Sequence, residues 1–562
     1  MRLLVALWGV LALGLATPVW AQPERRPPPS PEEVDRAVQR AIDALYARHK
    51  PDLLWENQPF SKRDPTKRHG PNDGQWGGLT SIVTYALLAA GEDPSDNPKL
   101  QAAINGLTQA QIEGVYALGM RAQVWHNLPP RPEYQRAMAR DYDLLVEAIQ
   151  GNDVSVRGQN RRNRGLFDYM LNETNRIDLS VSQYGVLGFW AAAQYGAQVP
   201  PGFWKEMEDG WLRTQQENGM WAYGGTPRDN HPGSVAITTA GVASLFITND
   251  YLRSTPNCNG NQFNPAIDRG LAFIAEHMPY LLGFETAPNA VVERQANVKT
   301  HTLYTLYGIE RIGVASGRKY IGGIDWYAEG ARYLLKKQNK SGMFGGLPDT
   351  AFAILFLVNG RQPPAITKLA FSSEANQRQS AWNQRSRDVG NLVDYIEYTD
   401  EREVNWISYQ FGSNDNVEDA VAELHDSPMA LLAAGGRLAL RPDDKEALKR
   451  YLETGGFLVI NADCSDRGII RQARELGTEL FGDRGYEWRR LPEDHPIYTT
   501  QKFNLKNVRR QPELLGLSNG VRELMVIATG DPARAWQLRD LSQDGPMELG
   551  VNLYLYSVGN LP

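Results

Sequence analysis

A turn motif that recurs before apolar helices constrains the fold of this chain more than any other feature. A glycine and an aromatic residue precede a run of small or apolar residues in three clear copies, "DGQWGGLTSIVTYALLAAG" (73–91), "NGMWAYGGTPRDNHPGSVAITTAGVASLFI" (218–247) and "SGMFGGLPDTAFAILFLVNG" (341–360). Weaker copies cover 165–196 and 300–317. Such a repeat predicts an array of helical hairpins. Because one hairpin cannot bury its apolar face alone, the hairpins must pack against one another.

The residues of each turn are suited to close packing. An aromatic side chain follows the glycine by two positions at Trp76, Trp221 and Phe344, where it offers a large apolar area for burial. The glycine pairs that follow Trp76 and Trp221 allow two backbones to approach closely. These patterns predict packing roles for the three aromatic residues.

One copy of the motif carries a family resemblance. The segment Gln215 to Trp221 reads Gln-x-x-x-Gly-x-Trp, and Gln338 to Phe344 repeats it with Phe in place of Trp. This resembles the prenyltransferase and squalene-cyclase repeat family, and the resemblance implies an α/α toroid with a central cavity over residues 31–360. The acidic motif of the terpene cyclases is absent, since the sole Asp-Asp pair, Asp443-Asp444, is typical of a helix cap. The resemblance therefore implies a fold and no activity.

The pattern changes after Pro363-Pro364, which predicts a linker at 361–366 and a second domain at 367–562. Apolar runs at 429–436, 457–462, 524–529 and 550–559 are typical of strands, and the segments 442–456 and 468–482 are typical of helices. Strands that alternate with helices predict an α/β domain with a mostly parallel sheet.

Several segments of this second domain carry another resemblance: "WNQRSRD" (382–388), "VNWISY" (404–409), "LKRYLETGGFLVINADC" (448–464), "DHPIY" (494–498) and "LGVNLYLYS" (549–557). They resemble a bacterial domain family of unknown function that is related to the class I glutamine-amidotransferase-like fold. The resemblance implies a flavodoxin-like sheet, with Cys464 on a strand-to-helix turn where relatives hold a nucleophile. The usual downstream His-x-Glu is missing, because the only later histidine, His495, has Ile497 at the glutamate position.

Two interpretations of Cys464 stay open. The first is a catalytic thiol that His495 and Asp494 would activate, since a nucleophile needs a base within hydrogen-bond reach. The second is a packed thiol, because free cysteine is usually a small buried hydrophobe. His495 likewise fits either a catalytic role or a role in forming the turn before Pro496.

Candidate ligand contacts in the helical domain are Trp76, Trp221, Tyr223 and His231, for a glycan, a lipid or a peptide. His231 lies in the polar segment "PRDNHPGS" and is the least typical of a core residue, whereas packing inside the repeats is the alternative for the aromatic residues. No metal-ligand spacing, phosphate-binding glycine loop or cofactor motif is present, so the sequence predicts no metal and no cofactor.

The N-terminus predicts export. Residues 1–21 have a positive start, an apolar core that is too short to span a bilayer, and a small residue at Ala21, as in a cleaved signal peptide. We expect a disordered linker at 22–30 and a first helix from Pro31, with Ser30 as its cap and Glu33 as the capping-box partner. No later segment predicts a transmembrane helix. A net charge of −6 gives no reason to expect nucleic acid.

The sequence thus predicts a secreted or periplasmic protein with a toroid and an α/β domain. The favoured function is a non-catalytic binding or assembly protein of the bacterial cell envelope, with a ligand or an envelope protein partner at the toroid cavity or at the strand ends. The alternative is an extracytoplasmic enzyme, either a thiol-dependent hydrolase or a polysaccharide-acting toroid. Cys258 and Cys464 are the only cysteines, and a disulfide between the two domains stays open.

Overall fold

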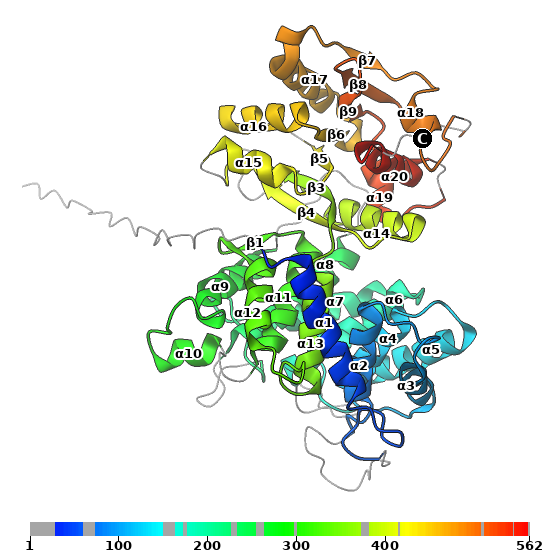
Figure 1. Ribbon diagram of the computed structural model, residues 1–562, viewed down its shortest axis with the longest axis vertical. Coiled ribbons are helices and arrows are strands. Elements are labelled where there is room, and N and C mark those ends of the chain that lie inside the picture. The colour runs from blue at the N-terminus through cyan, green and yellow to red at the C-terminus, as the bar shows by residue number, and fades with distance from the viewer. Residues whose placement is uncertain are drawn as a thin grey trace, which may run out of the picture.

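The fold was analysed in a computed structural model of the chain. It describes residues 28–59, 74–149, 163–171, 177–225, 233–253, 264–296, 301–371, 382–413, 416–435, 437–506, 508, 511–542 and 545–559. The predicted signal peptide, His231 and Cys258 lie outside these residues. The described part has a helical N-terminal region and a C-terminal region built on a mostly parallel sheet, which confirms the predicted order of the two folds (Figure 1).

Six helices of the N-terminal region form a closed ring. Each packs on the next, and the last packs back on the first: α2 (Gly78–Ala89), α4 (Val115–His126), α6 (Leu179–Gln194), α8 (Val235–Leu252), α11 (Thr302–Ser316) and α13 (Leu347–Asn359). Their residues are apolar on nearly all sides, as expected for helices with neighbours all round. The repeated motif predicts five of these helices; α4 is the sixth, and its segment lacks the glycine pair.

A second set of helices surrounds the ring: α1 (Pro31–Tyr46), α3 (Pro98–Gln109), α5 (Pro132–Ala148), α7 (Pro201–Thr214), α9 (Pro265–Leu281) and α12 (Trp326–Lys337). All but α12 begin with proline at the first helical position, where the missing N–H costs nothing. The predicted capping box of Ser30 and Glu33 is present at α1. The remaining elements are α10 (Ala290–Ala296) and a small hairpin of β1 (Tyr320–Ile321) and β2 (Ile324–Asp325).

The predicted tight turns require glycine in at least one copy of the motif. Gly219 has a φ of 89°, and a Cβ atom there would lie 2.2 Å from the carbonyl oxygen of Arg269. Only glycine fits such a position. One ring helix, α8, is long and apolar enough to cross a membrane by length and composition, but most of it is buried inside the protein.

The C-terminal sheet has the strand order β4-β3-β5-β6-β9-β8-β7. The first five strands are parallel and follow the order of a flavodoxin-like sheet, whereas β8 and β7 are antiparallel additions. The strands are β3 (Pro364–Ala370), β4 (Asn405–Gln410), β5 (Met429–Ala434), β6 (Phe457–Ala462), β7 (Trp488–Arg490), β8 (Leu514–Ser518) and β9 (Glu523–Ala528).

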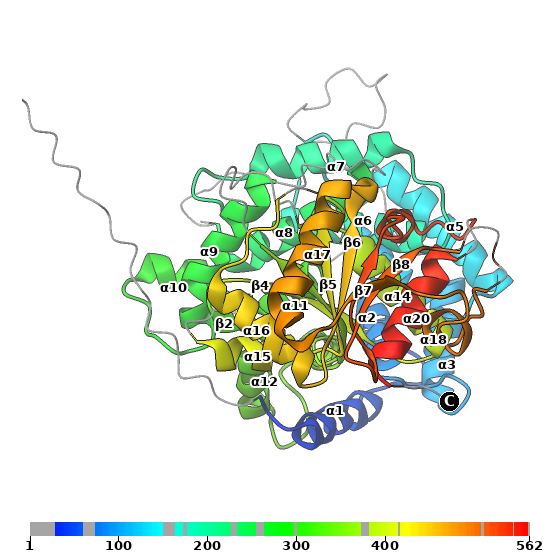
Figure 2. The same cartoon turned by 90° about the horizontal axis from the view of Figure 1, so that it is seen from above.

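Helices cover both faces of this sheet (Figure 2). One face carries α14 (Asp388–Asp400), α19 (Ala533–Leu538) and α20 (Pro546–Ser557), with α18 (Pro496–Thr499) beside α20. The other face carries α15 (Val417–Leu424), α16 (Pro442–Glu453) and α17 (Arg467–Phe481). Every residue of β5, β6 and β9 is buried, because helices pack against both sides.

Two predictions about this region are wrong. The segment 550–559, predicted as a strand, lies largely within helix α20, which begins at Pro546 and is capped by Glu548. Its apolar and aromatic residues alternate as in a strand, but they are buried on nearly all sides of a helix. The predicted linker 361–366 is shorter than expected, because β3 already begins at Pro364. Proline is accepted there as the first residue of a strand.

The two regions contact one another through polar groups. The backbone N–H of Ser408 donates to the carbonyl of Gly317 at 2.6 Å, and Lys319 forms an ion pair with Asp426 at 2.5 Å. Further contacts join Tyr320 to Glu423 at 2.9 Å, Arg387 to Asp250 at 3.5 Å and Arg539 to Gln194 at 2.6 Å. The ends of α6, α8 and α11 therefore face the α/β region.

Candidate functional site

Cys464 lies on the turn between β6 and α17, where the sequence predicts it. It belongs to a short 3₁₀ turn, Asp463–Ser465, and has a φ of 54°. A non-glycine residue in this left-handed region is uncommon and must be held there by its surroundings.

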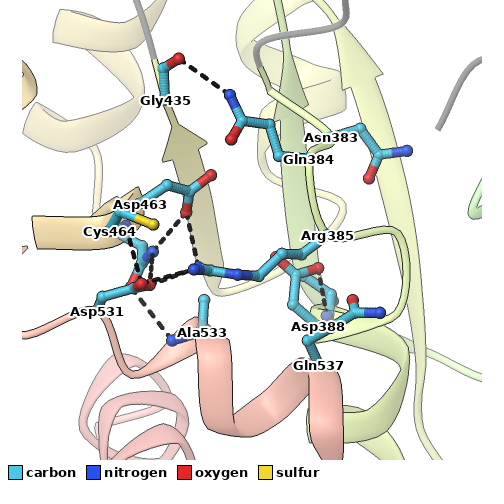
Figure 3. A network of polar contacts seen from close by, with 12 residues as sticks. Asn383, Gln384, Arg385, Asp388, Gly435, Asp463, Cys464, Asp531, Ala533 and Gln537 are labelled. Carbon is cyan, nitrogen blue, oxygen red and sulfur yellow. Dashed lines mark hydrogen bonds and ion pairs between the residues drawn. The ribbon is translucent and has the colours of Figure 1, made fainter. Parts of the chain in front are cut away.

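Asp531, which follows β9, lies next to this turn and holds it (Figure 3). Its carboxylate accepts the backbone N–H of Cys464 at 2.8 Å and the side-chain amide of Asn461 at 3.0 Å. Both terminal nitrogens of Arg385 also donate to it, one of them at 2.6 Å. A fork of this kind is the strongest pairing that a guanidinium makes with a carboxylate.

The contacts of Asp531 belong to a larger set of buried charges, which we call the strand-end network: Lys368, Arg385, Asp388, Asp463 and Asp531. Lys368 on β3 donates to Asp388 at 2.5 Å, and Arg385 donates to Asp463 at 3.1 Å. The network lies at the carboxyl ends of β3, β6 and β9, beside the point where the strand order reverses between β3 and β5. Ligands of such sheets usually bind in this region.

Asp463 differs from the other acids of the network. Burial raises its pKa to about 6, against the opposing effect of Arg385. One of its oxygens accepts bonds from Arg385 and Asn461, and the other has no hydrogen-bond partner. The side chain is 1% exposed. The network therefore fixes the turn at Cys464 but offers little surface to a ligand.

The sulfur of Cys464 is disulfide-bonded. The chain's other cysteine, Cys258, lies outside the described residues. Because a nucleophile must be a thiolate, Cys464 has no nucleophilic sulfur in this state.

The structure does not bring Cys464 and His495 together. The ring of His495 lies 3.4 Å from Glu523, which begins β9. In the parallel pair of β6 and β9, Asn461 lies opposite Ala528, so Cys464 lies at the carboxyl ends of the strands and Glu523 at the amino ends. The six residues of β9 separate these two ends by about 20 Å. Asp494 is exposed beside His495.

His495 instead forms the turn at the start of α18, which is the alternative role considered for it. Its Nδ1 accepts the backbone N–H of Ile497 at 3.2 Å. Its partner Glu523 also binds Arg489, at 2.5 Å and 3.1 Å.

The described candidate ligand contacts of the helical region differ in exposure. Trp221 is 0% exposed, and its indole N–H donates to the carbonyl of Trp211 at 2.9 Å. A Cβ atom on Gly241 would lie 2.7 Å from the Trp221 ring, so Trp221 is a packing residue with no free face. Trp76 and Tyr223 are partly exposed; the indole of Trp76 donates to the carbonyl of Gln58 at 3.1 Å. His231 lies outside the described residues.

A polar group in the middle of the helical ring is absent from the sequence-based candidates. We call it the ring-interior cluster, and it consists of Tyr85, Tyr116, Gln183, Tyr184, Tyr304, Tyr307, Glu310 and Arg311. These residues come from α2, α4, α6 and α11. The available signal is a set of tyrosine and charged residues inside otherwise apolar repeats, as in "THTLYTLYGIER" (300–311).

Contacts across the ring hold the cluster together. The amide of Gln183 donates to the hydroxyl of Tyr304, and Arg311 donates to Gln183 at 2.9 Å. The rings of Tyr116 and Tyr184 meet edge to face with centroids 4.6 Å apart. Since α6 and α11 are not neighbours in the ring, the bonds of Gln183 cross its interior.

Three buried polar atoms of this cluster have no hydrogen-bond partner: the Tyr184 hydroxyl, Oε2 of Glu310 and Nη2 of Arg311. Buried polar groups are paired in the large majority of cases, so three orphans in one cluster require an explanation. Tyr85, Tyr116, Tyr304 and Arg311 are also partly exposed, although they lie on ring helices. Solvent therefore reaches part of this cluster.

The charge of the cluster follows from its burial. Burial raises the pKa of Glu310 to about 8, with Arg311 and Asn359 acting in the opposite direction. Burial also raises the pKa of Tyr307 to about 12 and that of Tyr304 well above its ordinary value. At neutral pH the acid and these hydroxyls are uncharged donors beside the charged guanidinium of Arg311.

In the described part of the chain, no group of three or more His, Cys, Asp or Glu side chains is placed to hold a metal ion.

A family model matches the C-terminal region. Residues 373–557 match the model of the family described as "Domain of unknown function (DUF4159)". The resemblance of this region to a domain family of unknown function is thereby confirmed. The resemblance of residues 31–360 to prenyltransferase and squalene-cyclase repeats stays a prediction. The comparison with curated proteins finds no match.

Two solved structures are similar to part of this chain. Both are described as "a possible member of GH105 family". The first, from Salmonella enterica subsp. enterica serovar Paratyphi A, has a TM-score of 0.39 and 13% identity, with 61% of this chain and 97% of that chain covered. The second, from Klebsiella pneumoniae subsp. pneumoniae, has a TM-score of 0.37 and 15% identity, with 63% and 98% covered. At these scores the likeness carries no argument about activity.

Proposed function

We propose that the protein is an exported, non-catalytic binding protein of the bacterial cell envelope, with its ligand held by the ring-interior cluster. The observation that carries this proposal is the set of three partnerless polar atoms beside partly exposed tyrosines. Leaving such groups buried and unpaired costs roughly 1–3 kcal/mol each. A ligand that supplies the missing partners would recover this cost.

The strand-end network has a structural role in this proposal. Its charges are buried, and most of them bind one another and the turn at Cys464. The α/β region then serves as a rigid body against the ring, and its outer surface remains available to an envelope partner.

Export is supported by the signal-peptide pattern of residues 1–21 and by the disulfide at Cys464, since disulfides persist in oxidising compartments. N-terminal sequencing of the protein from a producing bacterium is expected to begin at Gln22. Recovery of a chain that retains residues 1–21 in the cytoplasm contradicts export.

The binding proposal is tested by removing one orphan atom without changing the shape of the site. Tyr184→Phe deletes the partnerless hydroxyl. We expect the free energy of unfolding of the empty protein to stay the same or rise, and the affinity for its ligand to fall about tenfold. The ligand is sought by native mass spectrometry of the purified protein and by calorimetry with oligosaccharides, fatty acids and short peptides.

Tyr134→Phe is the control, because Tyr134 lies on the outer helix α5 and stacks on Trp125. It is expected to leave ligand affinity unchanged. Equal ligand affinities of the wild type and Tyr184→Phe would remove the ring-interior cluster as the site. Cleavage of a bound oligosaccharide would favour the polysaccharide-acting alternative.

A further inference from the structure

Arg311 is partly exposed and differs from the buried arginines Arg121 and Arg385 in how its donors are used. Arg121, which is 0% exposed, has its donors bound by the carboxylate of Asp141 and by the carbonyls of Leu107 and Ala110, at 3.0 Å and 2.8 Å. Arg385 is held by the fork to Asp531. Each of these structural arginines has a carboxylate partner.

Arg311 has no such carboxylate among the described residues. Its Nη1 donates to the neutral amide of Gln183, its guanidinium lies 5.6 Å from the centre of the Tyr307 ring, and its buried Nη2 has no partner. Glu310 does not serve as the carboxylate partner of Arg311. Adjacent residues of a helix point in different directions, and Oε2 of Glu310 is itself without a partner.

Most of the groups near Arg311 are donors, and the carboxyl of Asp178 lies farther along the cluster, near Tyr304. Tyr304 and Tyr184 carry hydroxyls, and Glu310 is protonated at neutral pH. Tyr116 and Tyr304 lie in the first turns of α4 and α11, and Gln183 lies near the start of α6. The N-terminal ends of these helices, which carry partial positive charge, therefore meet at the same part of the ring.

We propose that Arg311 is the counter-charge for a carboxylate on the ligand, with Nη2 as the donor that this carboxylate engages. The inference rests on the proposed binding function and narrows it to anionic ligands. A carboxylate that reaches Nη2 would complete a charge-assisted hydrogen bond inside the ring, and neighbouring hydroxyls would orient it. Acidic sugars, fatty acids and peptide C-termini all carry this group.

The test compares matched pairs of probes that differ only in charge: glucuronic acid and glucose, decanoate and decanol, and a tripeptide with a free C-terminus and its amide. Calorimetry is performed with the full mature protein. In at least one pair we expect the acid to bind about tenfold more tightly than its neutral counterpart. The pair that shows the preference identifies the source of the carboxylate.

Arg311→Met is expected to erase this preference while leaving the affinity for the neutral probe unchanged. Arg311→Lys retains the charge and is expected to keep part of the preference, which shows that the site remains folded. Arg36→Met, on the exposed face of α1, is the control and should behave as the wild type.

The possible failures are distinct. If the acid and its neutral counterpart bind equally, or if the preference survives in Arg311→Met, the carboxylate inference is overturned and the binding function stands. If none of the six probes binds, the inference and the proposed binding of these ligand classes both fail.

Discussion

Glu310 illustrates how a single residue sets the chemistry of the ring. It is 3% exposed, one of its oxygens has no partner, and burial raises its pKa to about 8. The ordinary pKa of a glutamate is 4.5. Between these two values the folded chain holds a proton that the unfolded chain has released. Stability is therefore lost as the pH rises through this window.

We predict that Glu310→Gln weakens this pH dependence. The amide has a similar shape and does not ionise, so the variant should match the wild type near pH 4.5. It should exceed the wild type at pH 9 by roughly 1–3 kcal/mol in the free energy of unfolding. Urea unfolding followed by tryptophan fluorescence measures this. Glu475→Gln, at an exposed position of α17, is the control. Parallel pH profiles for Glu310→Gln and the wild type would contradict the prediction.

At the scale of elements, the turn between β6 and α17 depends on a residue that follows β9. Asp531 binds Arg385, Asn461 and the backbone of Cys464, whereas Asp463 uses only one of its two oxygens. Asp531 and Asp463 belong to the same network, but their carboxylate oxygens accept hydrogen bonds from different numbers of donors. Their asparagine variants should therefore differ.

We predict that Asp531→Asn lowers the free energy of unfolding by about 3 kcal/mol or more. Both oxygens of Asp531 accept hydrogen bonds, so the new amide nitrogen would point its N–H groups at another donor, and Arg385 would lose its two-bond pairing with the carboxylate. Asp463→Asn should change it by less than about 1 kcal/mol, since the amide nitrogen can replace the partnerless oxygen. Guanidinium unfolding midpoints of the two variants give the comparison. Equal losses would show that the network does not distinguish the two acids.

Sequence patterns predict the elements of this protein better than its contacts. They predict β5, β6 and β9 from apolar runs, and α16 and α17 from helical periodicity and capping residues. They do not predict β3, β4, β7 or β8. The segment of α20 alternates like a strand, and only its packing and its cap at Glu548 make it a helix. The separation of Cys464 from His495 depends on strand order, which local sequence does not encode. The ring-interior tyrosines look like ordinary core residues until their partners are known.

At the scale of the whole molecule, the two regions are joined by the polar contacts of Lys319, Arg387 and Arg539. Cys464 is disulfide-bonded and lies on the α/β side. A cross-link stabilises mainly by restricting the unfolded chain, and long loops gain most.

We predict that the oxidised protein shows no reactive thiol after denaturation without reductant, and two after reduction. Cys464→Ser should lower the free energy of unfolding by about 2–4 kcal/mol and release one thiol at Cys258. Thiol titration and thermal unfolding measure both effects. A free thiol in the denatured, unreduced wild type would contradict the disulfide.

The ring closes between its first helix, α2, and its last helix, α13, so it cannot close before α13 has been synthesised. Gln338 donates to the carbonyl of Ala37 at 2.7 Å, Arg40 donates to that of Asn339 at 2.9 Å, and α13 packs on α1 and α2. Contacts this distant in sequence slow folding, because the entropy of closing a long loop is lost before the contacts form. Until synthesis passes Asn359, helix α13 is incomplete and cannot cover the apolar faces of α2 and α11. Export in an unfolded state, followed by folding after translocation, would spare the cytoplasm this aggregation-prone intermediate.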